Sequence, residues 1–184
     1  MTGGRPRPGP PRGRPSRSLS GWFVAMALVA LATAALERCR VPDAAGNETW
    51  TVRIVHDGDT VTCHDTAGRA HRIRLLGIDA PEITQPHGPE ARAALERKVG
   101  HRRVAVETHG YDRHGRLLGK LWALDRDVNL EMVAEGHAWA FGGFAPDPEY
   151  VEAESLARRE RRGLWAAASP EEPSRWRAAH PHVP

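Results

Sequence analysis

Two short stretches, residues 55–61 and 74–82, constrain this chain more than any other part of its sequence. The first holds Asp57-Gly58, a pair typical of a tight hairpin turn because glycine accepts the positive φ that such turns require. The second alternates as a strand does and ends at Pro81. Carboxylates thus stand at a turn and at a strand end, which predicts a polar site at one end of a small sheet.

Asp59, Asp79 and Glu82 would bring oxygen ligands to that site, and Arg74 would bring a guanidinium. Hard divalent cations prefer oxygen ligands, and the planar guanidinium suits a phosphate group. The set predicts a metal-dependent phosphodiesterase that acts on nucleic acid. Simpler readings exist: Arg74 also fits a solvated strand face, and Asp57 is expected to serve the turn rather than to bind a metal.

From residue 48 to residue 168 the apolar pattern is β-rich. Alternation predicts strands near 50–55, 61–63, 73–78, 104–106 and 117–124, and helical spacing predicts helices over 89–99, 128–136 and 146–162. This order fits a five-stranded OB-type barrel. The expected class is α+β, mainly β, with about three helices. Residues 169–184 are expected to be a polar tail outside the domain.

The N-terminal part of the chain has two sections. Residues 1–18 are rich in Arg, Pro and Gly and are expected to be disordered. Residues 19–36 form an uncharged apolar run that fits a secretory signal peptide and also approaches the roughly 20 residues that span a bilayer. A cleaved signal and an uncleaved membrane anchor both remain open. Either one predicts a domain outside the cytoplasm, secreted or anchored, after a linker at 37–47.

Charge and cysteine content exclude some classes. The net charge of +3 comes from residues 1–40, which hold seven of the 26 Lys+Arg and one of the 23 Asp+Glu. The remainder is near −3, whereas a protein that coats DNA is basic throughout. Cys39 falls in the linker, and Cys63 is expected in the core. No zinc-type Cys/His spacing occurs, and two cysteines make no disulfide framework.

Four motifs occur in one order with compatible gaps: Asp-Gly-Asp-Thr-Val at 57–61, Arg-Leu-Leu-Gly-Ile-Asp-Ala-Pro-Glu at 74–82, Gly-Pro-Glu-Ala at 88–91 and Asp-Arg-His-Gly-Arg at 112–116. Together they resemble the staphylococcal nuclease (thermonuclease-like) family over about residues 50–165. Members of that family are OB-fold enzymes that hydrolyse DNA and RNA with calcium. The resemblance therefore implies a nucleic-acid substrate and cleavage that leaves a 5′-hydroxyl and a 3′-phosphate.

The same resemblance implies roles for individual residues. Asp59, Asp79 and the backbone carbonyl of Ala80 would ligate one Ca²⁺, with Mn²⁺ and Mg²⁺ left open by the oxygen ligands. Glu82 would position or deprotonate the attacking water. This chemistry is reasonable on its own terms, since hydrolysis adds negative charge to the phosphoryl oxygens and a fixed cation stabilises that charge.

Arg74 and Arg116 would grip the scissile phosphate, and His114 would contact the substrate. The family's archetype has a tyrosine where His114 stands, and that ring packs near a bound base. The replacement therefore puts base stacking in doubt more than catalysis. Trp139, Phe141 and Phe144 lie where the family places aromatic residues near the nucleotide, although core packing is the expected role of Trp139.

Two other classes compete with the enzyme. A non-catalytic OB module would only bind nucleic acid or protein, but it has no need for three acids beside a phosphate site. An envelope-anchored interaction protein would explain residues 19–36 and leave the acids unexplained. The expected partners are a nucleic acid and, if the segment is uncleaved, the membrane through residues 19–36. No obligate protein partner is evident, and a monomer is expected.

Overall fold

The computed structural model describes residues 48–142 and 147–181. The predictions for residues 1–47, which include the disordered start, the apolar segment and Cys39, lie outside the described residues, as does Phe144. Within the part that is described, no helix has both the length and the apolar character needed to cross a bilayer.

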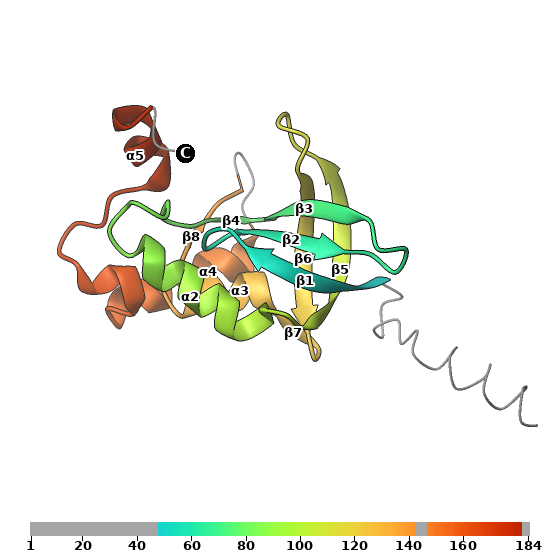
Figure 1. The fold of residues 1–184 in the computed structure, drawn as a ribbon. Coiled ribbons are helices and arrows are strands. Elements are labelled where there is room, and N and C mark those ends of the chain that lie inside the picture. Colours follow the sequence, from blue (N-terminus) through green and yellow to red (C-terminus); the bar gives the residue numbers. More distant parts are fainter. Residues whose placement is uncertain (1–47, 143–146, 182–184) are drawn as a thin grey trace, which may run out of the picture. The chain divides into compact units, whose positions relative to one another are not determined.

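Five strands of the described chain close into a barrel (Figure 1). They are β1 (Glu48–Val55), β2 (Thr60–His64), β3 (Ala70–Leu75), β5 (Arg103–Tyr111) and β6 (Leu117–Ala123). Neighbours pair antiparallel in the order β3-β2-β1-β5-β6, and a parallel pairing of β3 with β6 closes the ring. This confirms the predicted mainly β, OB-type fold.

Three shorter strands complete the described sheets. β7 (Arg126–Asp127) extends the sheet beside β6. β4 (Ile78–Asp79) leaves the barrel after β3 and pairs with β8 (Trp139–Ala140) in a separate two-stranded sheet, with Asp79 opposite Trp139. The strand predicted over 73–78 is thus interrupted at Leu76-Gly77, where Gly77 adopts a left-handed φ of 80°.

The barrel interior follows from the alternation of apolar residues. β6 alternates buried and half-buried positions along its whole length, as expected for a strand with one face in the core. Val61, Cys63, Ile73 and Leu121 are fully buried there. The core position predicted for Cys63 is confirmed, and burial raises the pKa of its thiol to about 12.

The described helices cover the barrel and extend it (Figure 1): α2 (Gly88–Val99), α3 (Val128–Ala134), α4 (Pro148–Arg159), the 3-10 turn η1 (Gly163–Ala166) and α5 (Pro173–Ala179). α2 buries Ala91, Leu95 and Val99, the face that the spacing predicts. Prolines in the first turn begin α2, α4 and α5. α5 lies in the segment predicted as a polar tail, and no helix was expected there.

The turn between β1 and β2 corrects one expectation. Gly58 has no positive φ, because the connection runs over residues 56–59 rather than over a two-residue turn. Glycine is required here for space instead. A Cβ at Gly58 would lie 2.7 Å from the Cβ of Ala80 and 2.8 Å from the Cβ of Ala91. The turn therefore packs directly against the segment that follows β4, which brings the two acidic motifs together.

Candidate active site

Asp59, at the start of β2, is buried and oriented by its neighbours. Its Oδ2 accepts a hydrogen bond from the backbone N–H of Ala80 at 2.7 Å, and its Oδ1 accepts one from the hydroxyl of Thr60 at 2.9 Å. Asp57 accepts from the backbone N–H of Asp59 at 2.9 Å. Asp57 thus stabilises the turn, as predicted, and Asp59 faces the segment that carries Asp79.

Arg74 joins the two predicted metal-binding aspartates. The pairing of β2 with β3 places Arg74 opposite Thr60, next to Asp59. Its Nη1 forms an ion pair with Asp59 Oδ2, and its Nη2 donates to Asp79 Oδ1 at 2.7 Å. With only 13% of its side chain exposed, Arg74 does not belong to a solvated strand face. The structure therefore brings Asp59, Arg74 and Asp79 together, as the sequence predicts.

Burial is the largest influence on the pKa values of Asp59 and Arg74. Burial raises the pKa of Asp59 to about 6, even though the guanidinium of Arg74 acts in the opposite direction. Burial likewise disfavours the charge on Arg74, but Asp59 and Asp79 more than offset it and raise the pKa of Arg74. A strongly perturbed carboxyl beside a fixed charge partner is typical of functional sites.

Glu82 lies on the loop between β4 and α2, and its backbone is clamped in place. Its N–H donates to the side chain of Gln85 at 3.1 Å, and its carbonyl accepts from the Gln85 N–H at 2.9 Å. A Cβ at Gly88 would overlap the Glu82 carbonyl oxygen, so only glycine fits there. The Glu82 side chain is about one-third exposed and lines the cleft.

Arg177 is a charged group of the site that sequence reasoning missed. From α5, its Nη1 donates to Glu82 Oε1 at 2.7 Å, and its Nη2 donates to Asp79 Oδ2 at 3.0 Å. Burial opposes the charge, yet hydrogen bonds to Asp79 and Glu82 raise the pKa of this arginine. Pro173 could have indicated a helix start in this segment, but no local pattern links residue 177 to residues 79 and 82.

Arg116 and His114 come from the hairpin that joins β5 to β6. Asp112 organises its tip, since it accepts from the backbone N–H groups of His114 and Arg116 and from Arg116 Nε at 2.8 Å. Despite burial, these bonds hold the pKa of Asp112 below its usual range. His114 is exposed and hydrogen-bonded to Arg113 at 3.1 Å. Both predicted substrate-binding residues of the hairpin line the cleft, His114 exposed and Arg116 half-buried against Asp112.

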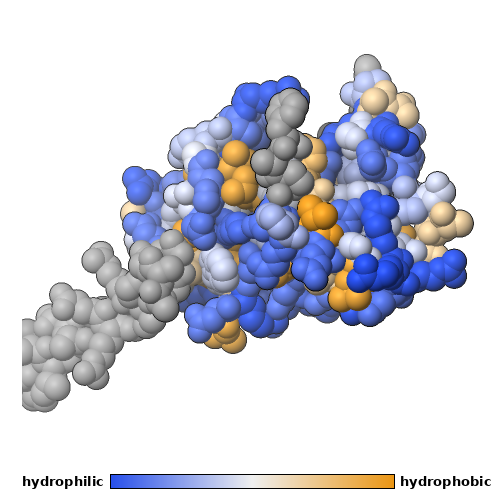
Figure 2. Space-filling view, turned by 180° about the vertical axis from the view of Figure 1, so that it is seen from behind, coloured by the Kyte–Doolittle hydropathy of each residue, from blue (hydrophilic) through white to orange (hydrophobic). Residues whose placement is uncertain are grey.

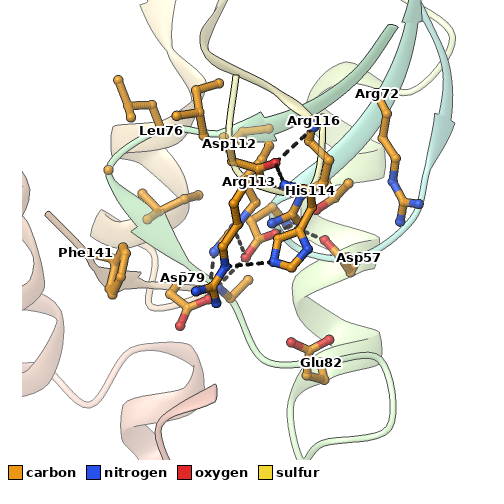
Figure 3. Close-up of a pocket in the computed structure, with 18 of the residues that line it drawn as sticks. Asp57, Arg72, Leu76, Asp79, Glu82, Asp112, Arg113, His114, Arg116 and Phe141 are labelled. Carbon is orange, nitrogen blue, oxygen red and sulfur yellow. Dashed lines mark hydrogen bonds and ion pairs between the residues drawn. The ribbon is translucent and has the colours of Figure 1, made fainter. Parts of the chain in front are cut away.

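These groups line one open cleft of about 1260 Å³. In Figure 3 the hairpin side chains Asp112 and Arg116 lie on the upper side of the pocket, with Asp79 and Glu82 on its lower side. Phe141 lies beside Asp79, whereas Trp139 is buried, as expected. Figure 2 shows a largely hydrophilic face from behind, with hydrophobic residues in small separate patches. The cleft combines acids and arginines from three parts of the fold.

The donor set fits a hard divalent cation. Asp59 and Asp79 are both buried, present carboxylate oxygens and flank a single guanidinium, and such oxygens are the ligands that Ca²⁺ and Mg²⁺ take. Among the described residues, no group of three or more His, Cys, Asp or Glu side chains is arranged around a metal position. The predicted site needs only two side chains, and the ligand role of the Ala80 carbonyl stays a prediction.

Comparison of the sequence with known proteins shows which family the chain is similar to. The model of the family described as "Staphylococcal nuclease homologue" matches residues 72–167. An "Uncharacterized endonuclease" of Haemophilus influenzae is 38% identical over 139 residues, which cover 74% of this chain and 78% of the relative. "Protein ParB" of Escherichia coli is 42% identical over 137 residues, or 68% of this chain and 76% of that protein.

A plant relative is matched over part of its length only. The "Probable staphylococcal-like nuclease CAN2" of Oryza sativa subsp. japonica is 38% identical over 119 residues, which are 64% of this chain and 32% of the plant protein. The family model, the bacterial relatives and the closed barrel with its acid-arginine cluster all agree. The chain belongs to the staphylococcal nuclease homologue family.

Proposed function

We propose that this protein is a calcium-dependent nuclease that hydrolyses phosphodiester bonds of DNA, RNA or both, with low sequence specificity. The observation that carries the proposal is the pair of buried carboxylates, Asp59 and Asp79, that share the buried Arg74 at the cleft. Burying charged groups is costly unless they are paired or bind a metal. Two buried carboxylates beside one arginine are not needed to form the barrel, so they indicate a functional site.

In the proposed reaction the arginines hold the phosphate. Arg74 and Arg116 line the same cleft, and each offers N–H donors to non-bridging phosphate oxygens. Negative charge grows on those oxygens as water attacks phosphorus, so fixed guanidinium groups stabilise the transition state more than the bound substrate. Lysine would supply the charge without the planar pair of donors.

Glu82 is the residue proposed to orient the attacking water or accept its proton. Its clamped backbone and partly exposed carboxylate suit a group that must meet water at one position. The bond from phosphorus to the 5′-oxygen would break, and that oxygen would leave as a hydroxyl. A Ca²⁺ held by Asp59, Asp79 and the Ala80 carbonyl would add positive charge for the phosphoryl oxygens and lower the pKa of a nearby water.

Low sequence specificity follows from the composition of the cleft. The exposed Phe141 and His114 offer ring faces, and stacking on such faces accepts every base. We also propose that the domain acts outside the cytoplasm, because a basic stretch precedes the uncharged run at 19–36. Whether that run is cleaved or retained as an anchor does not alter the proposed chemistry.

One observation favours a second candidate, a binding module without catalysis. Arg74 and Arg177 engage both oxygens of Asp79, and Arg177 also engages Glu82. In this state the acids are paired with guanidinium groups and would repel a nucleic-acid backbone less. The enzyme remains the better reading, because a binding surface needs neither a buried Asp59 nor a clamped Glu82.

Cleavage by the purified full-length chain distinguishes the two functions. Labelled single-stranded DNA and RNA would be incubated with Ca²⁺, with a chelator and with the variant Glu82→Gln. We expect degradation that requires the cation and that falls by about 1000-fold in the variant, the range of a lost general base. Glu152→Gln, an exposed change on α4, is the matched control. A folded protein that binds DNA without cutting it under any of these conditions would establish the binding module.

A further inference from the structure

Arg177 lies between two acids of the cleft, Asp79 and Glu82. Its guanidinium spans the two acids, with contacts of 2.7 Å to Glu82, 3.0 Å to Asp79 Oδ2 and 3.3 Å to Asp79 Oδ1. Arg74 takes Asp79 Oδ1 from the other side at 2.7 Å. Both oxygens of a predicted cation ligand are therefore already bonded to guanidinium groups.

This arrangement competes with a divalent cation. A carboxylate oxygen that already accepts charge-assisted bonds has fewer free lone pairs for a metal. A guanidinium held against Asp79 would also repel a second positive charge at the same carboxylate. For Asp79 to bind a cation, one of the two arginines has to withdraw.

Exposure and attachment indicate which arginine withdraws. Arg74 is 13% exposed, belongs to a barrel strand and pairs with two aspartates. Arg177 is 47% exposed and sits on a helix of seven residues. The described attachments of this segment include one hydrogen bond from Gln85 to the Glu171 carbonyl, the buried Pro173 and the contacts of Arg177 itself. Moving α5 disrupts much less structure than moving β3.

We propose that Arg177 is a cation-sensitive latch. Without a divalent ion, its guanidinium holds Asp79 and Glu82 and fixes α5 against the cleft. Cation binding at Asp59 and Asp79 displaces Arg177, frees the Glu82 carboxylate for water and loosens α5. The inference rests on the proposed function only in requiring that Asp59 and Asp79 bind a divalent cation.

Calorimetric titration of Ca²⁺ into the full-length chain tests the latch directly. Arg177→Gln keeps a polar side chain and removes the competing charge, so we expect Ca²⁺ to bind about fivefold more tightly, in line with the loss of a partly exposed ion pair. Arg175→Gln is the matched control, because Arg175 lies on the same helix, is 77% exposed and, within the described ranges, forms its ion pair with Glu172, at 3.9 Å. Unchanged or weaker Ca²⁺ binding by Arg177→Gln would overturn the latch.

Hydrogen exchange supplies an independent readout. In the wild-type chain, Ca²⁺ should speed amide exchange in residues 173–180, while exchange in β2 and β3 stays unchanged or slows. Slower exchange of α5 with Ca²⁺ would contradict the proposal, because it would mean that the cation and the helix bind together. These readouts need no cleavage, so tighter Ca²⁺ binding by Arg177→Gln would support the latch even if the protein proved to cut no nucleic acid.

Discussion

Each end of strand β2 carries a buried aspartate with an arginine partner, but the pKa values of the two aspartates shift in opposite directions. Asp59 precedes the strand and Asp65 follows it, both are buried, and each has an arginine partner from the next strand or turn. Asp65 accepts bonds from Ala67 N–H, Arg69 N–H, Arg69 Nε and His71 Nε2, all between 2.8 and 3.0 Å. Hydrogen bonds from His71 and Arg69 hold the pKa of Asp65 well below its usual range, whereas burial raises that of Asp59 to about 6.

The difference separates a structural acid from a functional one. At Asp65, the donors of its own turn satisfy a single carboxylate. At the other end, Asp59 and Asp79 share the guanidinium of Arg74, and Asp79 and Glu82 share that of Arg177. Carboxylate oxygens in such a cluster are the ligands that a hard divalent cation takes. One end of β2 thus holds a carboxylate satisfied within its own turn, and the other holds carboxylates shared between elements that line the cleft.

The largest expected effect is a loss of cleavage when Arg74, the arginine partner of Asp59, is replaced, compared with Arg69, the partner of Asp65. Arg74→Lys keeps a charge but loses the planar fork, and we expect phosphodiester cleavage to fall by about 100-fold or more. Arg69→Lys, at the Asp65 end, is the control, because the Arg69 side chain is 76% exposed and lies away from the cleft. Initial cleavage rates on one labelled DNA strand measure both. Equal losses in the two variants would contradict a catalytic role specific to Arg74.

The turn glycines give the next largest effect. Gly58→Ala places a methyl group against Ala80 and Ala91, at 2.7 and 2.8 Å, and should lower the free energy of unfolding by about 2 kcal/mol while separating Asp59 from Asp79. Gly68→Ala meets no atom within 4 Å but has a φ of +79°. It should cost about 1 kcal/mol and leave cleavage intact. Urea unfolding and cleavage rates of both variants test this, and an active Gly58→Ala enzyme would refute the packing argument.

The two aspartates should have opposite effects on the pH dependence of stability. The folded pKa of Asp59, about 6, exceeds its ordinary value of 3.8, so the folded, cation-free protein loses stability as pH rises between those values. Asp59→Asn should remove this slope and raise the free energy of unfolding at pH 7.

Asp65 has a depressed pKa, so its stabilisation is present above the unfolded pKa and is lost as pH falls through the folded pKa. Asp65→Asn should therefore lower stability at pH 7. Denaturant unfolding in the presence of chelator, from about pH 2 to pH 7, measures each contribution as the difference in stability between the wild type and the variant. Differences that change with pH in the same direction for the two variants would show that the two ends of β2 do not differ as described.

The barrel and the acidic end of β2 could be predicted because their signals are local. Alternation marks the strands, and the spacing of Asp59, Arg74 and Asp79 places them at adjoining strand ends. Arg177 could not be predicted, since its contact with Asp79 spans 98 residues and α5 has no apolar periodicity that points toward the cleft. The role of Gly58 was also beyond the sequence, because the methyl groups of Ala80 and Ala91 that restrict it come from other elements.

We propose that the Asp59 end of β2 is a cation-dependent phosphodiester site and that the Asp65 end is structural. The decisive experiment is cleavage of one labelled DNA strand across a Ca²⁺ titration, by Asp59→Asn and Asp65→Asn beside the wild type. We predict that Asp59→Asn stays folded and loses cleavage at every Ca²⁺ concentration, while Asp65→Asn cleaves with the wild-type Ca²⁺ dependence at temperatures where it is folded. Undiminished, Ca²⁺-dependent cleavage by Asp59→Asn would contradict the account.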